Sequence, residues 1–354
     1  MAPTRRRKRR KKGKARPRAR SLPPPLPRGV TVVLRPTIGT DGRVPKAAQP
    51  WYTEPTFVHL AVLLEEEEPA TPEEMEKTID RYIRPGQEPN FPPPTQPWHQ
   101  AQEVAYEGWE KKTKRGRARA ARKALGISQD TPDGHLLLAH DAASWEEAAA
   151  LCVQAVAAAE RILGADFLTQ YEEEFWEYAV TRPYMRARLA LGYCLWKQGK
   201  RDAAAEHFQA LVRLNPGDNQ GARYLLAALW LEQGKFDAAR RLATRYSPDS
   251  LCYWAYNRVL YEFHQRGPSR RAWRRLERAF QQNPFVPLYL AGKWHARSHR
   301  IDFVDPGEES EALEYYGIFG DAWRMTEGAL EWLAEQFPEP DDLYLGEVDD
   351  RTAL

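Results

Sequence analysis

The chain has 354 residues and a net charge of +3, but residues 1–20 hold twelve Lys or Arg and no acid, so the rest carries a net −9. No stretch approaches the roughly 18 apolar residues of a membrane span, and Pro-rich residues 22–27 stand where a secretory signal needs an apolar core. Three widely separated cysteines, Cys152, Cys194 and Cys252, favour buried thiols over disulfides or a zinc site. We therefore expect a cytoplasmic protein.

Residues 1–30 form a basic arm that we expect to be disordered, because like charges repel and little apolar surface can be buried. Such an arm is a candidate for binding nucleic acid, a ribosome or another polyanion, non-specifically since it contains no aromatic residue. The candidate residues are Arg5, Arg6, Arg7, Lys8, Arg9, Arg10, Lys11 and Lys12. The open alternatives are a solubilising tail, a nuclear address, or an arm that folds back on acidic residues such as 65–68.

Residues 31–99 are a Pro-rich region of mixed character. A short strand is predicted at 31–34, and residues 57–64 are apolar enough for a buried helical turn or strand. A helix is predicted at 73–83, started by Thr71 and Pro72, and residues 85–97 resemble an extended linker.

Residues 100–180 are predicted to form degenerate helical repeats. A basic helix is expected at 115–125, and the sequence Thr-Pro-Asp at 131–133 is typical of a helix start. A partner helix is expected at 145–163. The aromatic and acidic segment 167–179 is interpreted as a capping insertion.

Residues 181–290 contain three copies of one repeat. Two Asn-Pro pairs, at 215–216 and 283–284, lie 68 residues apart, which is twice a 34-residue period. Each copy has a glycine that ends its first helix, since glycine tolerates the reversed conformation. These glycines are Gly199, Gly234 and Gly267. A small residue follows where the two helices cross, namely Ala204, Ala239 and Ala272.

A single hairpin of this kind cannot cover its own apolar stripe, so neighbouring hairpins must stack. We therefore predict an all-α fold, a right-handed helical solenoid. A C-terminal helical cap is expected at 291–340, with a loop at 303–307 and helices at 311–323 and from Gly328. An acidic tail, 341–354, is expected to follow.

The repeat resembles the tetratricopeptide repeat, whose pattern is matched over about 184–290 and weakly from about residue 100. It departs from that pattern at Ala243, where an aromatic residue is usual, and the middle copy lacks a closing Asn-Pro pair. A second resemblance, to the suppressor-of-tumorigenicity-seven family and to soluble bacterial repeat proteins sharing its module, rests on residues 283–290, 311–315, 322–323 and 328–330. Both resemblances imply protein interaction and neither brings a catalytic residue.

The sequence holds no nucleotide-binding or metalloprotease motif. His295 and His299 share a helix face near Asp302 and could ligate a metal, but the neighbouring cations favour ordinary surface histidines. We therefore predict no catalytic residue, no cofactor and no metal site.

The candidate partner site is the concave face of the solenoid, which would accept an extended peptide or a helix. Arginine and aromatic side chains are the usual interface anchors. Those predicted to face it are Arg186, Tyr193, Arg223, Tyr224, Trp254, Asn257 and Tyr261. The alternative is that several of them pack between repeats. The leading hypothesis is a non-enzymatic interaction scaffold. A nucleic-acid- or ribosome-associated factor, and an enzyme with its site in residues 31–99, remain the alternatives.

Overall fold

The computed structural model describes residues 35–36, 42–67, 70–84, 86–164, 173, 175–292 and 303–337. Its centre is a series of helix hairpins, each formed by two helices that pack against each other. The hairpins are α3 (Pro97–Trp109) with α4 (Lys114–Ile127), α5 (Pro132–His140) with α6 (Trp145–Leu163), α8 (Arg182–Lys197) with α9 (Arg201–Leu214), α10 (Ala222–Glu232) with α11 (Phe236–Arg245), and α12 (Tyr253–Arg266) with α13 (Arg270–Gln282).

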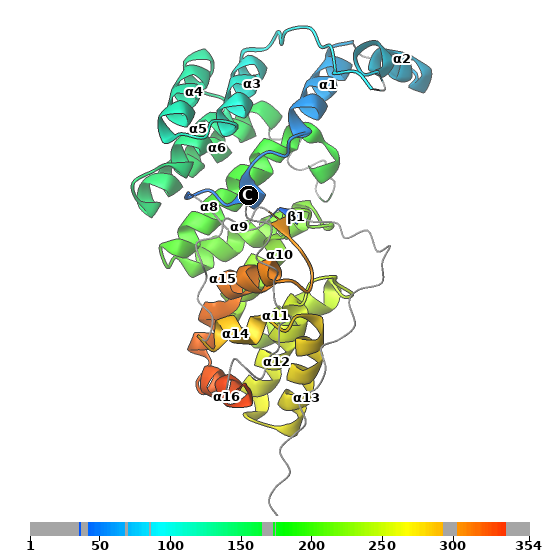
Figure 1. Ribbon diagram of the computed structural model, residues 1–354. Helices are drawn as coiled ribbons and strands as arrows, with labels where there is room; N and C mark the ends of the chain where they lie inside the picture. Colours follow the sequence, from blue (N-terminus) through cyan, green and yellow to red (C-terminus); the bar gives the residue numbers. More distant parts are fainter. Residues whose placement is uncertain are drawn as a thin grey trace, which may run out of the picture.

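The hairpins stack into an elongated array that runs from α3 and α4 to α12 and α13 (Figure 1). The remaining helices are α1 (Glu54–Glu67), α2 (Pro72–Tyr82), α14 (Val286–Leu290), α15 (Glu309–Met325) and α16 (Ala329–Gln336), with short 3-10 turns η1 (Lys46–Ala48), η2 (Phe175–Glu177) and η3 (Ala179–Thr181). The prediction of an all-α helical repeat fold is confirmed. In the described residues, β structure is limited to the antiparallel pairing of β1 (Arg35–Pro36) with β2 (Phe303–Val304).

The turns of the repeats follow from their glycines. Gly199 and Gly234 have φ angles of 76° and 70°, in the left-handed region that favours glycine. In both turns the residue after the glycine donates its backbone N–H to a carbonyl in the last turn of the preceding helix. Lys200 donates to the Leu195 carbonyl at 3.0 Å, and Lys235 donates to the Trp230 carbonyl at 2.7 Å. The first two hairpins of the repeat region therefore reverse in the same way.

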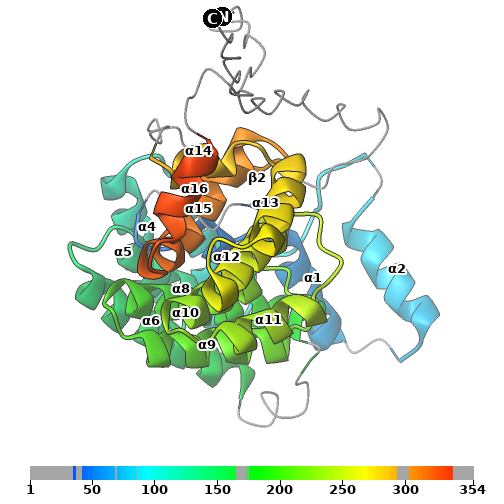
Figure 2. The ribbon, with the colours of Figure 1, turned by 90° about the horizontal axis from the view of Figure 1, so that it is seen from below.

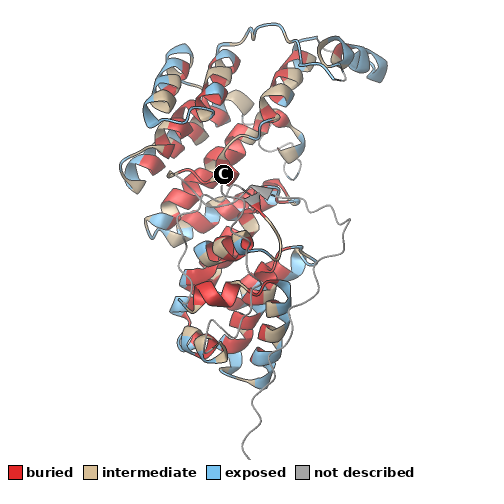
Figure 3. Cartoon of the chain, viewed as in Figure 1, coloured by how far each residue is buried: buried red, intermediate tan, exposed pale blue. Residues whose placement is uncertain are grey.

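The helices of the first repeat approach closely. A Cβ atom added to Gly192 of α8 would lie 2.7 Å from a ring carbon of the fully buried Phe208 on α9. The corresponding residues of the second repeat, 35 positions later, are Ala227 and Ala243. The small residues predicted at the crossings, Ala204, Ala239 and Ala272, are all buried. Figure 3 shows this buried layer running along the inside of the array.

The N-terminal region packs on the solenoid instead of standing apart from it. The Cys194 thiol of α8 donates to the Arg43 carbonyl at 3.7 Å, and Arg186, about two turns earlier on α8, pairs with Glu54. Residues 43–54 therefore run antiparallel along α8. Within this segment Val44 is fully buried. By contrast, α2 is mostly exposed and projects from the body in Figures 1 and 2.

The C-terminal helix α15 packs on α10 and contacts α12 through side chains. The Tyr253 hydroxyl of α12 donates to Glu314 at 2.9 Å, and the Tyr253 and Phe319 rings meet at 5.9 Å. In Figure 1, α15 lies beside α10, although α11 to α14 separate the two helices in the sequence. This helix therefore connects two hairpins of the stack.

Most helices match their predicted ranges, including α2, whose N-cap Thr71 accepts from the Glu74 N–H at 3.2 Å. The uncertain segment 57–64 is helical, as part of α1. The predicted loop 303–307 is wrong in its first two residues, which form β2 through pairing with a distant part of the chain. The strand predicted at 31–34 and residues 167–172 of the capping insertion lie outside the described residues.

Candidate functional site

The structure buries most of the residues predicted to face a partner. Five of the seven have exposed fractions below a tenth: Arg186 2%, Tyr193 7%, Tyr224 0%, Trp254 3% and Asn257 8%. Arg223 and Tyr261 are half-buried. A buried side chain offers a partner almost no surface, so the set as a whole does not form an open concave face.

Arg186 is buried because it neutralises two acidic groups. Its Nη2 lies 2.5 Å from Asp133 Oδ2 of α5, and its Nη1 donates to Glu54 of α1. Tyr106 of α3 donates its hydroxyl to the same Glu54 carboxylate at 3.0 Å. Four helices thus meet at one guanidinium, and the expectation that Arg186 contacts a partner is wrong because the chain's own N-terminal helix covers it.

The electrostatics of this cluster fit a structural role. Burial opposes the charge of Arg186, but Asp133 and Glu54 raise the pKa of its guanidinium well above the usual range. Burial also raises the pKa of the Glu54 carboxyl, against the opposing effect of Arg186. Removing any one member would leave a buried charge without its partner.

Arg223 and Tyr224 bind Asp249, a residue of the loop that connects α11 to α12. Arg223 pairs with Asp218 at 3.0 Å and with Asp249 at 3.1 Å, and the Tyr224 hydroxyl donates to the same Asp249 oxygen at 2.7 Å. The fully buried Tyr224 is therefore part of the core, which corrects its assignment to the partner surface. Tyr193 is likewise in the core, where its ring packs against the ring of Trp145 in the preceding hairpin, with 6.0 Å between the ring centroids.

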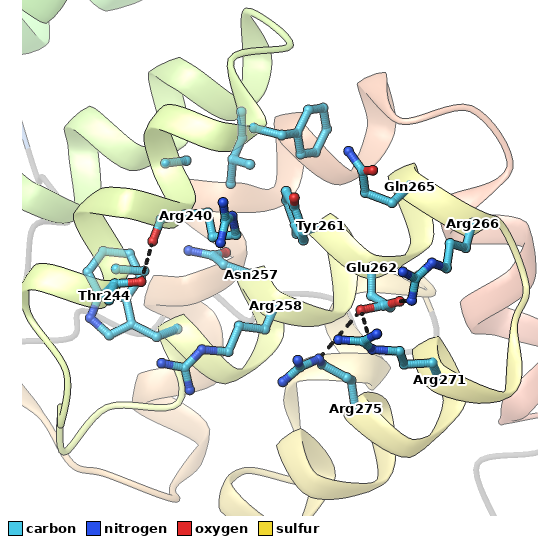
Figure 4. A pocket seen from close by; sticks show the side chains of 15 residues that line it. Arg240, Thr244, Asn257, Arg258, Tyr261, Glu262, Gln265, Arg266, Arg271 and Arg275 are labelled. Carbon is cyan, nitrogen blue, oxygen red and sulfur yellow. Dashed lines mark hydrogen bonds and ion pairs between the residues drawn. The ribbon is translucent and has the colours of Figure 1, made fainter.

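The other three predicted residues, Trp254, Asn257 and Tyr261, line one cavity of about 420 Å³ between α11 and α12 (Figure 4). We call this cavity the α11–α12 groove. It exists because α11 and α12 contact each other much less than α9 and α10 do. Ala243, which lines the groove, is the smaller counterpart of Phe208 in the first repeat.

Two buried donors in the groove have no partner among the described residues, Trp254 Nε1 and Asn257 Nδ2. The orientation of the Asn257 amide follows from its neighbours. Trp323 Nε1 donates to the Tyr315 hydroxyl at 2.8 Å, so that hydroxyl donates its own proton to Asn257 Oδ1 at 3.0 Å. The Asn257 oxygen is thereby used, and its N–H groups remain available. Unpaired buried donors cost about 1–3 kcal/mol each.

The rim of the groove is cationic. Five arginines and one glutamate line it: Arg240, Arg258, Arg266, Arg271, Arg275 and Glu262. Glu262 is shared by the last three arginines, at 2.8, 3.1 and 3.8 Å, so it offsets only part of their charge. Arg258 reaches the Ser247 hydroxyl at 3.3 Å, and no carboxylate of the described residues forms an ion pair with it.

The groove therefore offers N–H donors and positive charge, a combination that binds carboxylates or other anions. Sequence reasoning selected Trp254, Asn257 and Tyr261 from their repeat positions, but it missed Arg240 and Arg258. The departure from the repeat pattern at Ala243 was the signal that could have located this opening.

Other predicted groups fall elsewhere. The arm residues Arg5–Lys12 and the trio His295, His299 and Asp302 lie outside the described residues. The three cysteines are free and buried, as expected. Burial raises the pKa of the Cys252 thiol well above its usual value, which favours the protonated thiol over the nucleophilic thiolate.

Comparison with known proteins bears on this same region. Residues 185–250 match a family model described as tetratricopeptide repeat. The match spans α8 to α11 and ends beside the groove, and it supports the tetratricopeptide resemblance but not the second one. No curated protein matches the chain. In the described part of the chain, no helix has the length and apolar character that crossing a membrane requires.

Proposed function

We propose that this chain is a non-enzymatic protein-interaction scaffold that binds an acidic segment of a partner in the α11–α12 groove. Tetratricopeptide repeats and stacked helix hairpins suggest an interaction scaffold. The observation that carries the choice of groove is the pair of unpartnered buried donors, Trp254 Nε1 and Asn257 Nδ2, beneath a rim of arginines.

The proposed ligand group is a carboxylate on a flexible stem. A Glu or Asp side chain would reach the buried donors after a shift of the Trp254 and Asn257 side chains that line the groove, while neighbouring acids of the same segment pair with Arg240 and Arg258 at the rim. Charge-assisted hydrogen bonds of this kind are stronger than neutral ones. A nucleic acid is less suited, because its phosphates are part of the backbone and cannot enter a cavity of about 420 Å³ individually.

An enzymatic function has less support than a binding function. The groove supplies donors and cations, while its one acid, Glu262, is occupied by three arginines. The buried acids Glu54 and Asp133 are paired with Arg186 and closed to solvent. Neither place combines a nucleophile or base with room for a substrate.

The test uses fluorescence anisotropy with labelled peptides rich in Glu and Asp, each paired with its Gln and Asn counterpart. We expect the acidic peptides to bind the wild-type chain. Arg240→Glu/Arg258→Glu reverses two rim charges and should weaken binding by about tenfold or more. The matched control is Arg274→Glu/Arg278→Glu, which changes two exposed arginines of α13 that do not line the groove.

Two results would refute the proposal. Equal weakening by both pairs would mean that only the general positive charge attracts the peptide. Displacement of the peptide by single-stranded RNA at lower concentration, with RNA binding lost on removal of residues 1–20, would instead favour a nucleic-acid-binding function of the arm.

A further inference from the structure

A second site, unrelated to the groove, lies where α1 meets α3. His59 of α1 and the pair His99 and Glu103 of α3 bring three potential metal ligands within 4.8 Å of one another. His99 and Glu103 are four residues apart, so they share one face of α3. His59 Nδ1 lies 2.7 Å from Glu103 Oε1, and His99 Nε2 lies 3.9 Å from the same oxygen.

These distances are close to those of a coordination sphere. Zinc binds histidine nitrogen and carboxylate oxygen at about 2.0–2.2 Å, so ligand atoms around a tetrahedral ion lie roughly 3.4 Å apart. The distance from Glu103 Oε1 to His59 Nδ1 is shorter than this value, and the distance from the same oxygen to His99 Nε2 is longer. Movements of less than about 1 Å in two side chains would accommodate an ion.

The surroundings hold the ligands in place and leave one of them without a protein partner. The His59 ring stacks on Phe91 at 4.5 Å, and the His99 ring stacks on Trp98 at 5.4 Å. His99 is 1% exposed, its Nδ1 has no hydrogen-bond partner among the described residues, and its Nε2 is too far from Glu103 for a hydrogen bond. An ion bound to Nε2, the ring nitrogen that faces Glu103, would give this buried imidazole a polar contact.

The site is also open and negatively charged on one side. The Glu103 side chain is 38% exposed, which provides a path for an ion. Burial and the neighbouring His59 lower the pKa of His99, and the charge of Glu66, another α1 residue, opposes them. A divalent cation is therefore favoured here by charge as well as by the donor set.

We propose that His59, His99 and Glu103 form a binding site for a divalent transition-metal ion, with zinc as the favoured ion. Two imidazoles and one carboxylate suit zinc, and they leave a fourth position for water. The ion would take the place of the proton that His59 shares with Glu103, and that proton would pass to solvent or to the other nitrogen of the His59 ring.

Such an ion would cross-link α1 and α3, two helices that otherwise contact each other little. Because α1 also carries Glu54, the partner of Arg186, the metal would stabilise the N-terminal region on the hairpin stack. This role is independent of ligand binding in the α11–α12 groove.

The test measures zinc bound by the full chain after EDTA treatment and equilibrium dialysis, with the visible absorption of cobalt(II) as a probe of the ligands. We expect about one tightly bound ion. His99→Ala and Glu103→Gln should each weaken zinc binding by at least about tenfold. Magnesium, which prefers oxygen ligands, should not compete. Zinc should raise the unfolding temperature of the wild-type chain but not of either variant.

A matched control separates this site from the other histidine pair of the sequence. His295→Ala/His299→Ala should retain the ion. The proposal is wrong if the wild-type chain binds no zinc, if Glu103→Gln keeps full affinity, or if the control loses the ion instead. Far-ultraviolet circular dichroism of each variant confirms that lost binding does not reflect lost folding.

Discussion

At the scale of single residues, the closest helix contact in the repeat region predicts a measurable cost. Gly192→Ala would place a methyl group 2.7 Å from the Phe208 ring, which is fully buried. We expect the free energy of unfolding to fall by about 1–3 kcal/mol, as for other overpacked cores. Urea denaturation measures this change.

A second glycine provides the control for this prediction. Gly317 lies in the middle of α15, is exposed, and has no atom within 4 Å of an added Cβ. Gly317→Ala should therefore stabilise the protein by about 0.5–1 kcal/mol, since alanine loses less backbone freedom in a helix. Equal effects of the two substitutions would show that helix propensity alone, and not the contact with Phe208, decides the result.

The buried ion cluster makes a stronger prediction at the same scale. Arg186→Met removes the guanidinium that lies between Glu54 and Asp133, so that the two buried carboxylates lose their shared cation. We expect a loss of about 3–5 kcal/mol in the free energy of unfolding. Adding Glu54→Leu to this variant should restore part of the loss, because one buried charge is then removed. A double variant no more stable than Arg186→Met would contradict this account.

At the scale of elements, local signals predicted the helices but could not predict what covers them. Gly199, Gly234 and the Asn-Pro pairs act within a few residues, so the sequence located the hairpins correctly. Arg186 was misplaced because its partner Glu54 is 132 positions away, and no local pattern links the two. The site at His59 and His99 was missed for the same reason, since its ligands come from different helices. The proposed segment boundaries at residues 30, 99, 180, 290 and 340 remain predictions.

The groove itself can be tested as a property of one helix pair. Ala227→Gly/Ala243→Phe copies the Gly192 and Phe208 pair of the first repeat into the second. The new ring should fill part of the cavity between α11 and α12, and acidic peptides should bind at least about tenfold more weakly, while helix content stays unchanged. The measurements are peptide anisotropy and circular dichroism. Undiminished peptide binding would place the ligand outside the groove.

At the scale of the whole molecule, the α11–α12 groove is a weak junction in an otherwise continuous stack. Solenoids unfold cooperatively only when the interfaces between neighbouring repeats are strong enough. Here the direct contact between α11 and α12 is thin, and α15 strengthens the junction by packing on α10 and by side-chain contacts with Tyr253 and Tyr256 of α12. The cooperativity of the whole chain should therefore depend on α15 more than on any helix inside the repeats.

This dependence can be measured with one core substitution in α15. Phe319 is fully buried and packs on Tyr253 and Tyr315, so Phe319→Ala should cost about 3–5 kcal/mol locally and loosen α15 from α12. We expect urea unfolding to split into two transitions, with the third repeat and the C-terminal helices unfolding first. Leu211→Ala, a substitution at a buried position of α9, should lower stability while keeping a single transition. A single transition in the Phe319 variant would mean that the thin α11–α12 contact couples the two parts without α15.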